Sequence, residues 1–172
     1  MSMKIKISKK PVNFIRAIKV LENRLLKIKD NKASEMIWIL EHPETYTAGT
    51  NFKNSEILDK RIKLYKTNRG GKITYHGPGQ IIFYFLINLN KRKKDIRWFV
   101  RVLENTIIET LKLYKIKSIA DRNNIGIWVK HNNRKKKVAA IGLKIKNWIA
   151  YHGFSLNYSV KLKNYKKIIP CG

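Results

Sequence analysis

The sequence predicts an α+β domain in which a mixed β-sheet packs against two helices. Several short segments have the apolar runs or the two-residue alternation of strands, and only two stretches show the three- and four-residue spacing of amphipathic helices. The two helical stretches are grouped apart from most of the strands, which favours an α+β arrangement. No repeat, low-complexity tract or internal linker divides the 172 residues, so we expect a single domain over residues 1–172.

The N-terminal part of the chain is predicted to hold one helix between two strands. Residues 3–7 alternate apolar and polar side chains, as a short strand does. From Pro11, which fits near a first helical turn, apolar residues recur every three or four positions up to Ile28. Residues 36–40 are all apolar and predict a strand buried on both faces. A turn and then a strand are expected over residues 59–67.

The C-terminal part is predicted to supply the second helix and the rest of the sheet. Residues 81–89 form an apolar run that predicts a central strand, and Asp95 is placed to cap a helix that continues to Tyr114. Two strands joined by an Asn-containing hairpin, one or two further strands and a short helical turn are expected at residues 123–130, 137–145, 148–158 and 164–168.

Residues 69–80, which we call the glycine-rich segment, contain four of the chain's nine glycines together with Arg69 and His76. Glycine is required where the backbone takes a positive φ or approaches another group closely. A plain turn between strands would explain one or two of these glycines, but it would not require the Arg and the His. The segment therefore predicts a loop that contacts a ligand.

Cys171 is the only thiol in the chain. A lone cysteine can be a buried, inert side chain, but its place between Pro170 and Gly172 favours a nucleophile, because Gly172 lets a substrate carbonyl come close. A thiol with an ordinary pKa near 8.5 is only partly ionised at neutral pH, and a nearby cation would lower that pKa. The residues alone leave the choice of cation open among Arg134, Lys135, Lys136 and Lys137.

The composition limits the cellular compartment and the kinds of partner that we expect for this protein. The single cysteine excludes an internal disulfide framework, the N-terminus lacks the apolar core of a secretory signal, and no apolar run is long enough to span a bilayer, so we expect a cytoplasmic protein. The formal charge of +27 has three interpretations: nucleic-acid binding, a general drift towards lysine, or attraction of acidic partners. Lysines occur throughout the chain, which favours drift with partner attraction added to it.

Five motifs in order resemble those of the lipoyl(octanoyl) transferases, which move an octanoyl group from acyl carrier protein onto lipoyl domains. The glycine-rich segment resembles the signature of that family. The other four are Ile39-Leu40-Glu41-His42-Pro43 followed by Tyr46-Thr47-Ala48-Gly49, Lys137-Val138-Ala139-Ala140-Ile141-Gly142, His152-Gly153-Phe154-Ser155-Leu156-Asn157 and Pro170-Cys171-Gly172. The five motifs together cover the chain from about residue 36 to its last residue.

The resemblance implies the biotin/lipoyl protein ligase fold and a cysteine thioester intermediate. It selects Lys137 as the partner of Cys171, first holding the thiolate and then acting as general base. It gives His76 a place in the pocket without proton transfer, and assigns no role to His42 or His152. An apolar slot for the acyl chain is available from Ile73, Tyr75, Ile141 and Phe154. The implied substrate-contacting residues are Arg69, Gly70, Gly71, Lys72, Ile73, Thr74, Tyr75, His76, Ala140, Ile141, Gly142, Gly153, Phe154 and Ser155.

The implied partners are octanoyl-acyl carrier protein, lipoyl domains of 2-oxoacid dehydrogenases and the glycine cleavage H protein, with the enzyme a monomer. No cofactor and no metal are implied, since no zinc spacing and no phosphate-binding motif occurs. The alternatives are a lipoate- or biotin-type ligase on the same fold, which would use ATP, and a basic nucleic-acid-binding module. One departure from the family is that its members continue for some tens of residues beyond Pro-Cys-Gly, whereas this chain ends at Gly172.

Overall fold

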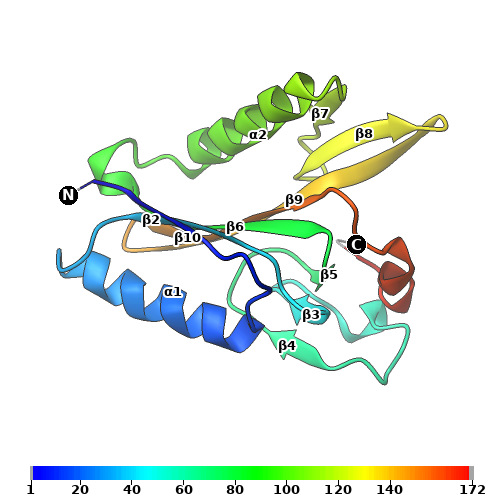
Figure 1. Cartoon of the computed structure of the whole chain (residues 1–172), viewed down its shortest axis with the longest axis horizontal. Helices are drawn as coiled ribbons and strands as arrows, with labels where there is room; N and C mark the ends of the chain where they lie inside the picture. Colours follow the sequence, from blue (N-terminus) through cyan, green and yellow to red (C-terminus); the bar gives the residue numbers. More distant parts are fainter. Residues whose placement is uncertain (1, 171–172) are drawn as a thin grey trace.

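The structure of the chain is a computed structural model that describes residues 2–170. Cys171, the predicted nucleophile, lies outside the described residues. Within them, the fold is α+β, with two β-sheets, two α-helices and three short 3₁₀ helices (Figure 1). The strands are β1 (Lys4–Ile7), β2 (Met36–Leu40), β3 (Thr45–Ala48), β4 (Leu64–Lys66), β5 (Ile73–His76), β6 (Gln80–Asn88), β7 (Ser118–Ala120), β8 (Ile127–His131), β9 (Arg134–Lys146) and β10 (Ile149–Asn157). The helices are α1 (Phe14–Lys29), α2 (Ile96–Leu113), η1 (Asn54–Glu56), η2 (Leu89–Lys91) and η3 (Leu162–Lys167).

The larger sheet has seven strands in the order β1-β2-β6-β10-β9-β8-β7. Strands β1 and β2 pair in parallel, and every other pair in this sheet is antiparallel. The smaller sheet has the order β4-β3-β5, with β3 parallel to β4 and antiparallel to β5. The fold is therefore mixed, as the sequence predicts, and β6 is central to the larger sheet.

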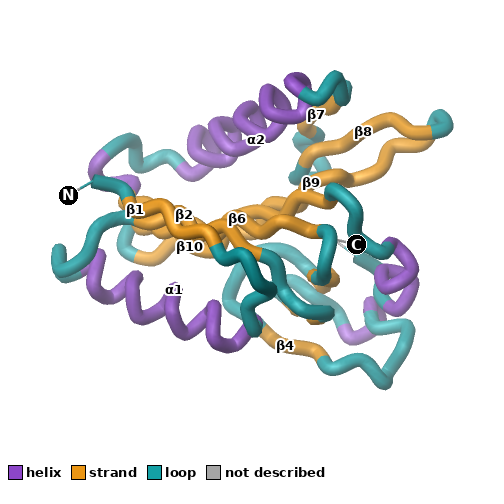
Figure 2. The backbone as a smooth tube through the Cα atoms, in the orientation of Figure 1, coloured by secondary structure: helices purple, strands orange, loops and turns teal. Residues whose placement is uncertain are grey.

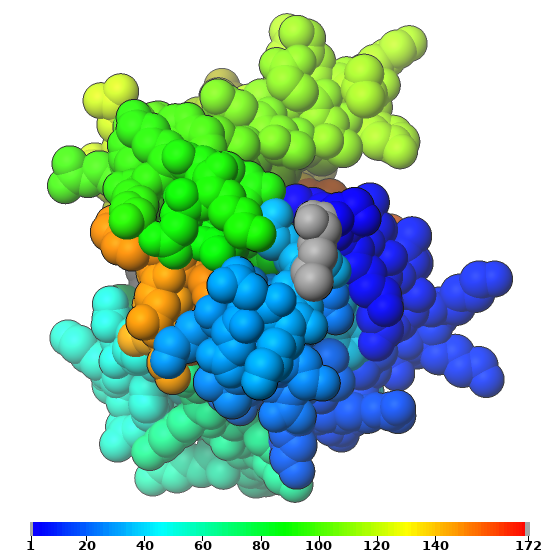
Figure 3. All heavy atoms as spheres, turned by 90° about the vertical axis from the view of Figure 1, so that its left-hand side faces the viewer, coloured from blue at the N-terminus to red at the C-terminus, as the bar shows by residue number. Residues whose placement is uncertain are grey.

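The two helices cover opposite faces of the larger sheet (Figures 1 and 2). One apolar cluster joins α1 to β2, β6 and β10 around Leu21, Trp38 and Leu86. A second cluster joins α2 to the other face around Phe85, Phe99 and Phe154, which is why β6 and β10 are buried on both sides. Figure 3 shows the two helical layers from the side, with the N-terminal strand at the surface between them.

Capping residues set the start of each α-helix. The Asn13 side chain accepts a hydrogen bond from the Arg16 amide (3.2 Å), so α1 begins at Phe14, after Pro11 and not with it. The Asp95 side chain accepts one from the Trp98 amide (2.9 Å), as the sequence predicts for α2. Neither helix is long and apolar enough to cross a membrane, and this holds for all helices within residues 2–170.

Three segments differ from the sequence-based expectation. The glycine-rich segment, expected to be a loop, contains strand β5, and Thr45–Ala48, where no strand was predicted, form β3. Residues 123–126 are not a strand, because the Asp121 carboxylate accepts hydrogen bonds from two following backbone amides and forms a turn instead. Residues 148–158, where one or two strands were expected, contain one, β10, in agreement with the prediction; it follows a turn in which Asn147 and Trp148 have positive φ.

Candidate active site

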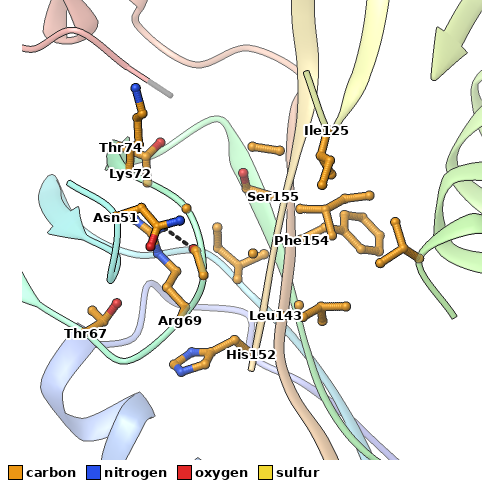
Figure 4. A pocket seen from close by; sticks show the side chains of 18 of the residues that line it. Asn51, Thr67, Arg69, Lys72, Thr74, Ile125, Leu143, His152, Phe154 and Ser155 are labelled. Carbon is orange, nitrogen blue, oxygen red and sulfur yellow. Dashed lines mark hydrogen bonds between the residues drawn. The ribbon is translucent and has the colours of Figure 1, made fainter. Parts of the chain in front are cut away.

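A cavity of about 460 Å³ lies where the glycine-rich segment meets the middle of β9 and β10. Its lining is divided by polarity, as Figure 4 shows. Asn51, Thr67, Arg69, Lys72 and Thr74 form a polar side, and the opposite side is apolar. The apolar residues come from the larger sheet, from the start of α2 and from the turn before β8, and they are Ile82, Ile96, Val100, Ile125, Ile141, Leu143 and Phe154. A cavity of this size with one apolar and one polar side can hold a small ligand that has both characters.

Most of the predicted substrate-contacting residues border this cavity. Those that do so are Arg69, Gly70, Gly71, Lys72, Thr74, His76, Ala140, Ile141, Gly142, Gly153, Phe154 and Ser155. The two others, Ile73 and Tyr75, do not line it. They alternate with Thr74 and His76 along β5, and they belong to a third apolar cluster, whose buried residues are Tyr46, Ile73, Tyr75, Val160 and Ile168. Of the four residues predicted for the apolar slot, Ile141 and Phe154 line the cavity, whereas Ile73 and Tyr75 do not.

Lys137 reaches the cavity because of an irregularity in β9. Trp128 pairs with Lys137 while its neighbour Ile127 pairs with Ala139, so Val138 is an extra residue in a β-bulge. The Lys137 ammonium nitrogen lies 4.8 Å from the centre of the Trp128 ring, a cation–π contact. Of the four basic residues at positions 134–137, all of which the structure describes, Lys137 alone lines the cavity.

Arg69 is held by a chain of directed hydrogen bonds. One guanidinium nitrogen, Nη2, donates to the Thr47 carbonyl oxygen (3.0 Å) and to Thr47 Oγ1 (2.9 Å). The other, Nη1, donates to the Gly70 carbonyl oxygen (3.0 Å). Gly49 makes room for this arrangement, since a Cβ there would collide with the Gly71 carbonyl oxygen and lie 2.8 Å from Arg69 Nη1. Arg69 thus shapes the turn of the glycine-rich segment.

His76 continues this chain and has both ring nitrogens engaged. Its Nδ1 lies 2.6 Å from Gln80 Oε1, and its Nε2 lies 3.3 Å from Thr47 Oγ1. Gln80 Nε2 donates to Asn157 Oδ1 (2.8 Å), so Oε1 is the acceptor for a proton on His76 Nδ1. Burial lowers the pKa of His76 to about 3, and the positive charge of Arg69 adds to the effect. His76 is therefore a neutral residue that positions the segment.

His42 is likewise a structural residue in this geometry. Its Nδ1 donates to the Val12 carbonyl oxygen (2.6 Å), and its Nε2 lies 2.8 Å from the Tyr84 hydroxyl, which donates to it. Burial lowers the pKa of His42, which agrees with a neutral ring that joins the approach to α1 to strand β6.

His152 and Gly153 form the most constrained part of β10. His152 has a φ of +64°, which is rare for a residue with a side chain, and its Nε2 lies 2.7 Å from Asn68 Oδ1. A Cβ at Gly153 would collide with the Phe83 carbonyl oxygen of β6, so only glycine fits there. Such strain gathers at functional sites, and both residues line the cavity. The sequence signal for this constraint is the His-Gly pair within an otherwise apolar strand.

Protonation of the buried histidines is expected to destabilise the folded protein. Burial lowers the pKa of His152 to about 4, and the usual value is 6.5, so the unfolded chain takes up a proton in this pH range that the folded chain does not. The free energy of unfolding that the neutral His152 ring contributes is fully present above pH 6.5 and is lost as the pH falls towards 4. We expect His152→Asn, which tolerates positive φ, to reduce the pH dependence of the free energy of unfolding by up to about 1.4 kcal/mol per pH unit between pH 4.5 and 6. Urea denaturation at several pH values measures this, and equal slopes in both proteins would contradict it.

Further residues of the cavity were not predicted from the sequence. They are Phe14, Asn51, Thr67, Ile82, Tyr84, Ile96, Val100, Asn123, Asn124, Ile125 and Leu143, together with His152, to which no role was assigned. Most of them come from segments that only the folded topology brings to β9 and β10. Among the described residues, no group of three His, Cys, Asp or Glu side chains could hold a metal ion.

Comparison with known proteins shows the family of this chain. Residues 17–172 match the model of the lipoyl protein ligase A/B catalytic domain. The chain is 44% identical over 167 residues to the octanoyltransferase of Wolbachia sp. subsp. Brugia malayi (strain TRS), a match that covers 96% of this chain and 82% of that protein. It is 44% identical over 169 residues to the octanoyltransferase of Ehrlichia chaffeensis (strain ATCC CRL-10679 / Arkansas), covering 97% of this chain and 79% of that protein.

A solved structure supports the same fold. The crystal structure of lipoate-protein ligase A bound with ATP superposes with a TM-score of 0.73 at 14% sequence identity, covering 100% of this chain and 73% of that one. At this identity the likeness shows a shared fold and nothing about the ligand.

Proposed function

Because this chain belongs to the lipoyl protein ligase A/B catalytic-domain family and is an octanoyltransferase of lipoate biosynthesis, we propose that it works through an acyl-enzyme on Cys171. The donor is octanoyl-acyl carrier protein and the acceptor is a lysine of a lipoyl domain. The observation that supports this mechanism is the cavity itself, in which an apolar side, the glycine-rich segment and the ammonium group of Lys137 meet.

In the first half-reaction, the Cys171 thiolate attacks the thioester carbonyl carbon of the donor. A carbon–sulfur bond forms to Cys171, and the bond to the carrier's sulfur breaks. The carrier leaves as a thiol after taking a proton from the Lys137 ammonium group, which becomes a neutral amine. Exchange of one thioester for another changes the free energy little, so the step serves to divide the transfer in two.

In the second half-reaction, the lysine amine of the acceptor attacks the same carbonyl carbon. The neutral Lys137 amine takes the proton that the nucleophile loses, an amide bond forms, and the Cys171 thiolate leaves. Lys137 is again an ammonium group beside a thiolate, so both residues return to their starting state. Formation of an amide from a thioester is favourable and drives the overall reaction.

The negative charge that develops on the carbonyl oxygen needs hydrogen-bond donors. The backbone amide of Gly70 is already used, because it donates to the Leu143 carbonyl oxygen (3.0 Å). We assign the role to the next amides of the glycine-rich segment, those of Gly71 and Lys72, since Gly71 has a φ of +88° and adjacent amides in such a turn can converge on an anion. The octanoyl chain extends along the apolar side, past Ile141, Leu143 and Phe154.

Acidic protein partners suit the charge of this chain. The tip of the β8–β9 hairpin, next to Lys137, carries three exposed basic residues, Arg134, Lys135 and Lys136. The formal net charge of the 172-residue sequence is +27 at pH 7. A basic surface at this place attracts an acidic carrier towards the cavity and raises the association rate at low ionic strength.

A purified transfer assay tests the proposed function. Octanoyl-acyl carrier protein and a lipoyl domain should give octanoylated lipoyl domain without ATP, and kcat/KM should fall as salt is added because screening weakens the attraction. Free octanoate with ATP should give no product. A strict requirement for ATP would instead establish the ligase alternative.

A further inference from the structure

Glu56, in the 3₁₀ helix η1, is a buried carboxylate outside the cavity. It is 4% exposed, and it is the only buried acidic residue among those that the structure describes. Its Oε1 lies 3.2 Å from the Lys72 ammonium nitrogen, and its Oε2 accepts a hydrogen bond from the Lys53 amide (3.3 Å). A buried charge is costly without partners, so the place of Glu56 needs an explanation.

The backbone around Glu56 holds the segment that leads to Cys171. The Glu56 carbonyl oxygen accepts a hydrogen bond from the Ile169 amide (2.8 Å), and the amides of Leu58 and Asp59 both donate to the Lys167 carbonyl oxygen (3.0 and 3.1 Å). Ile57 and Ile168 form an antiparallel bridge between these hydrogen bonds. The Ile168 side chain, 2% exposed, is anchored in the third apolar cluster. Residues 167–169 are thus fixed on residues 56–59.

Lys72 connects this attachment to the cavity. It belongs to the glycine-rich segment and lines the cavity (Figure 4). Its ammonium nitrogen lies 3.2 Å from Glu56 Oε1. Its carbonyl oxygen accepts a hydrogen bond from the Gly49 amide (3.1 Å), which ties it to the turn around Arg69. A continuous path therefore runs from the cavity wall through Lys72 and Glu56 to Ile169, two residues before Cys171.

We propose that Glu56 is a positioning residue for the nucleophile: its ion pair with Lys72 and its backbone hydrogen bond with Ile169 hold residues 167–169, which precede Cys171 in the sequence, in register with the cavity wall. This inference rests on the proposed role of Cys171. The charge on Glu56 sets the position of η1, and η1 sets the position of residues 167–169. Loss of register by about 1 Å at a reacting group can slow a reaction by up to about 100-fold.

The chain offers a matched control in Glu35. Its side chain also forms an ion pair, with Arg92 (2.6 Å), and also accepts a hydrogen bond from a backbone amide, that of Asn88 (2.7 Å). The side chains of Glu35 and Glu56 are 12% and 6% exposed. Glu35 does not line the cavity, so Glu35→Ala reproduces the loss of a semi-buried ion pair away from the site.

The test compares Glu56→Ala, Glu56→Gln and Glu35→Ala by the rate of acyl-enzyme formation from octanoyl-acyl carrier protein. We expect Glu56→Ala to lower the rate at saturating donor by about tenfold or more without changing the half-saturating donor concentration. Glu56→Gln, which keeps the shape and an acceptor for Lys53, should recover part of the rate, and Glu35→Ala should react within about twofold of wild type. In a Lys72→Met background, Glu56→Ala should lower the acylation rate little further, because the Lys72–Glu56 ion pair is already absent.

Hydrogen exchange at the Ile169 amide supplies a readout that does not depend on activity. Glu56→Ala should speed this exchange, and Glu35→Ala should leave it unchanged. The inference would be overturned if Glu56→Ala formed the acyl-enzyme at the wild-type rate with unchanged exchange at the Ile169 amide. It would also be overturned if Glu35→Ala lost as much acylation rate as Glu56→Ala and both losses followed the unfolded fraction of the protein. If wild type itself formed no acyl-enzyme, the proposed function would have failed, and the exchange result would still decide the role of Glu56.

Discussion

Lys137→Met is expected to lower octanoyl transfer by at least about 100-fold, because it removes both the cation that stabilises the thiolate and the general base of the second half-reaction. Met keeps most of the length of the side chain and its packing along Trp128, so the folded state loses only the cation–π contact, about 0.5–1 kcal/mol. The loss should therefore fall on the rate and not on folding. Steady-state transfer assays with thermal denaturation of the same samples measure the two effects separately.

Lys136→Met is the matched control for Lys137→Met. Lys136 precedes Lys137 in β9, so its side chain points to the other side of the strand, and it does not line the cavity. Both substitutions remove one positive charge from the same hairpin, so any general effect of charge on carrier binding appears in both variants. Equal activity in the two variants would contradict a chemical role for Lys137.

Much of the helical and central-strand structure could be predicted from the sequence because local signals define it. The Asp95 cap and the apolar spacing of α2 lie within one helix, and the run from Ile81 to Ile87 could only be buried. Two of the three strands of the smaller sheet, β3 and β5, were not predicted, and for β5 the physical reason is clear. The side chains of β5 face an apolar cluster on one side and the cavity on the other, so Thr74 and His76 alternate with Ile73 and Tyr75, a mixture that also occurs in many loops.

The motifs located the cavity, but its geometry depends on long-range contacts. That Arg69 is held by Thr47, 22 positions earlier, follows only from the pairing of β3 with β5. The bulge that brings Lys137 to the cavity depends on its register with Trp128, which the sequence does not specify. Glu56 gave no signal at all, since an isolated acidic residue in a polar loop does not reveal that it is buried against Lys72 and Ile169.

Cys171→Ser is expected to abolish the acyl-enzyme and to reduce transfer at least about 1000-fold, because a neutral serine hydroxyl is a far weaker nucleophile than a thiolate. Cys171 is the only cysteine of the chain, so a thioester can form on no other side chain. The substitution changes one atom, and the donor, the cavity and Lys137 remain as in wild type. It therefore separates covalent catalysis from direct attack of the acceptor amine on the bound donor.

Intact-protein mass spectrometry after mixing with octanoyl-acyl carrier protein, in the absence of an acceptor, tests the acyl-enzyme directly. Wild type should gain about 126 Da, the gain should disappear with hydroxylamine, and Cys171→Ser should gain nothing. Wild type that transfers octanoyl groups without ever carrying this adduct, or an equal adduct on Cys171→Ser, would contradict the acyl-enzyme mechanism.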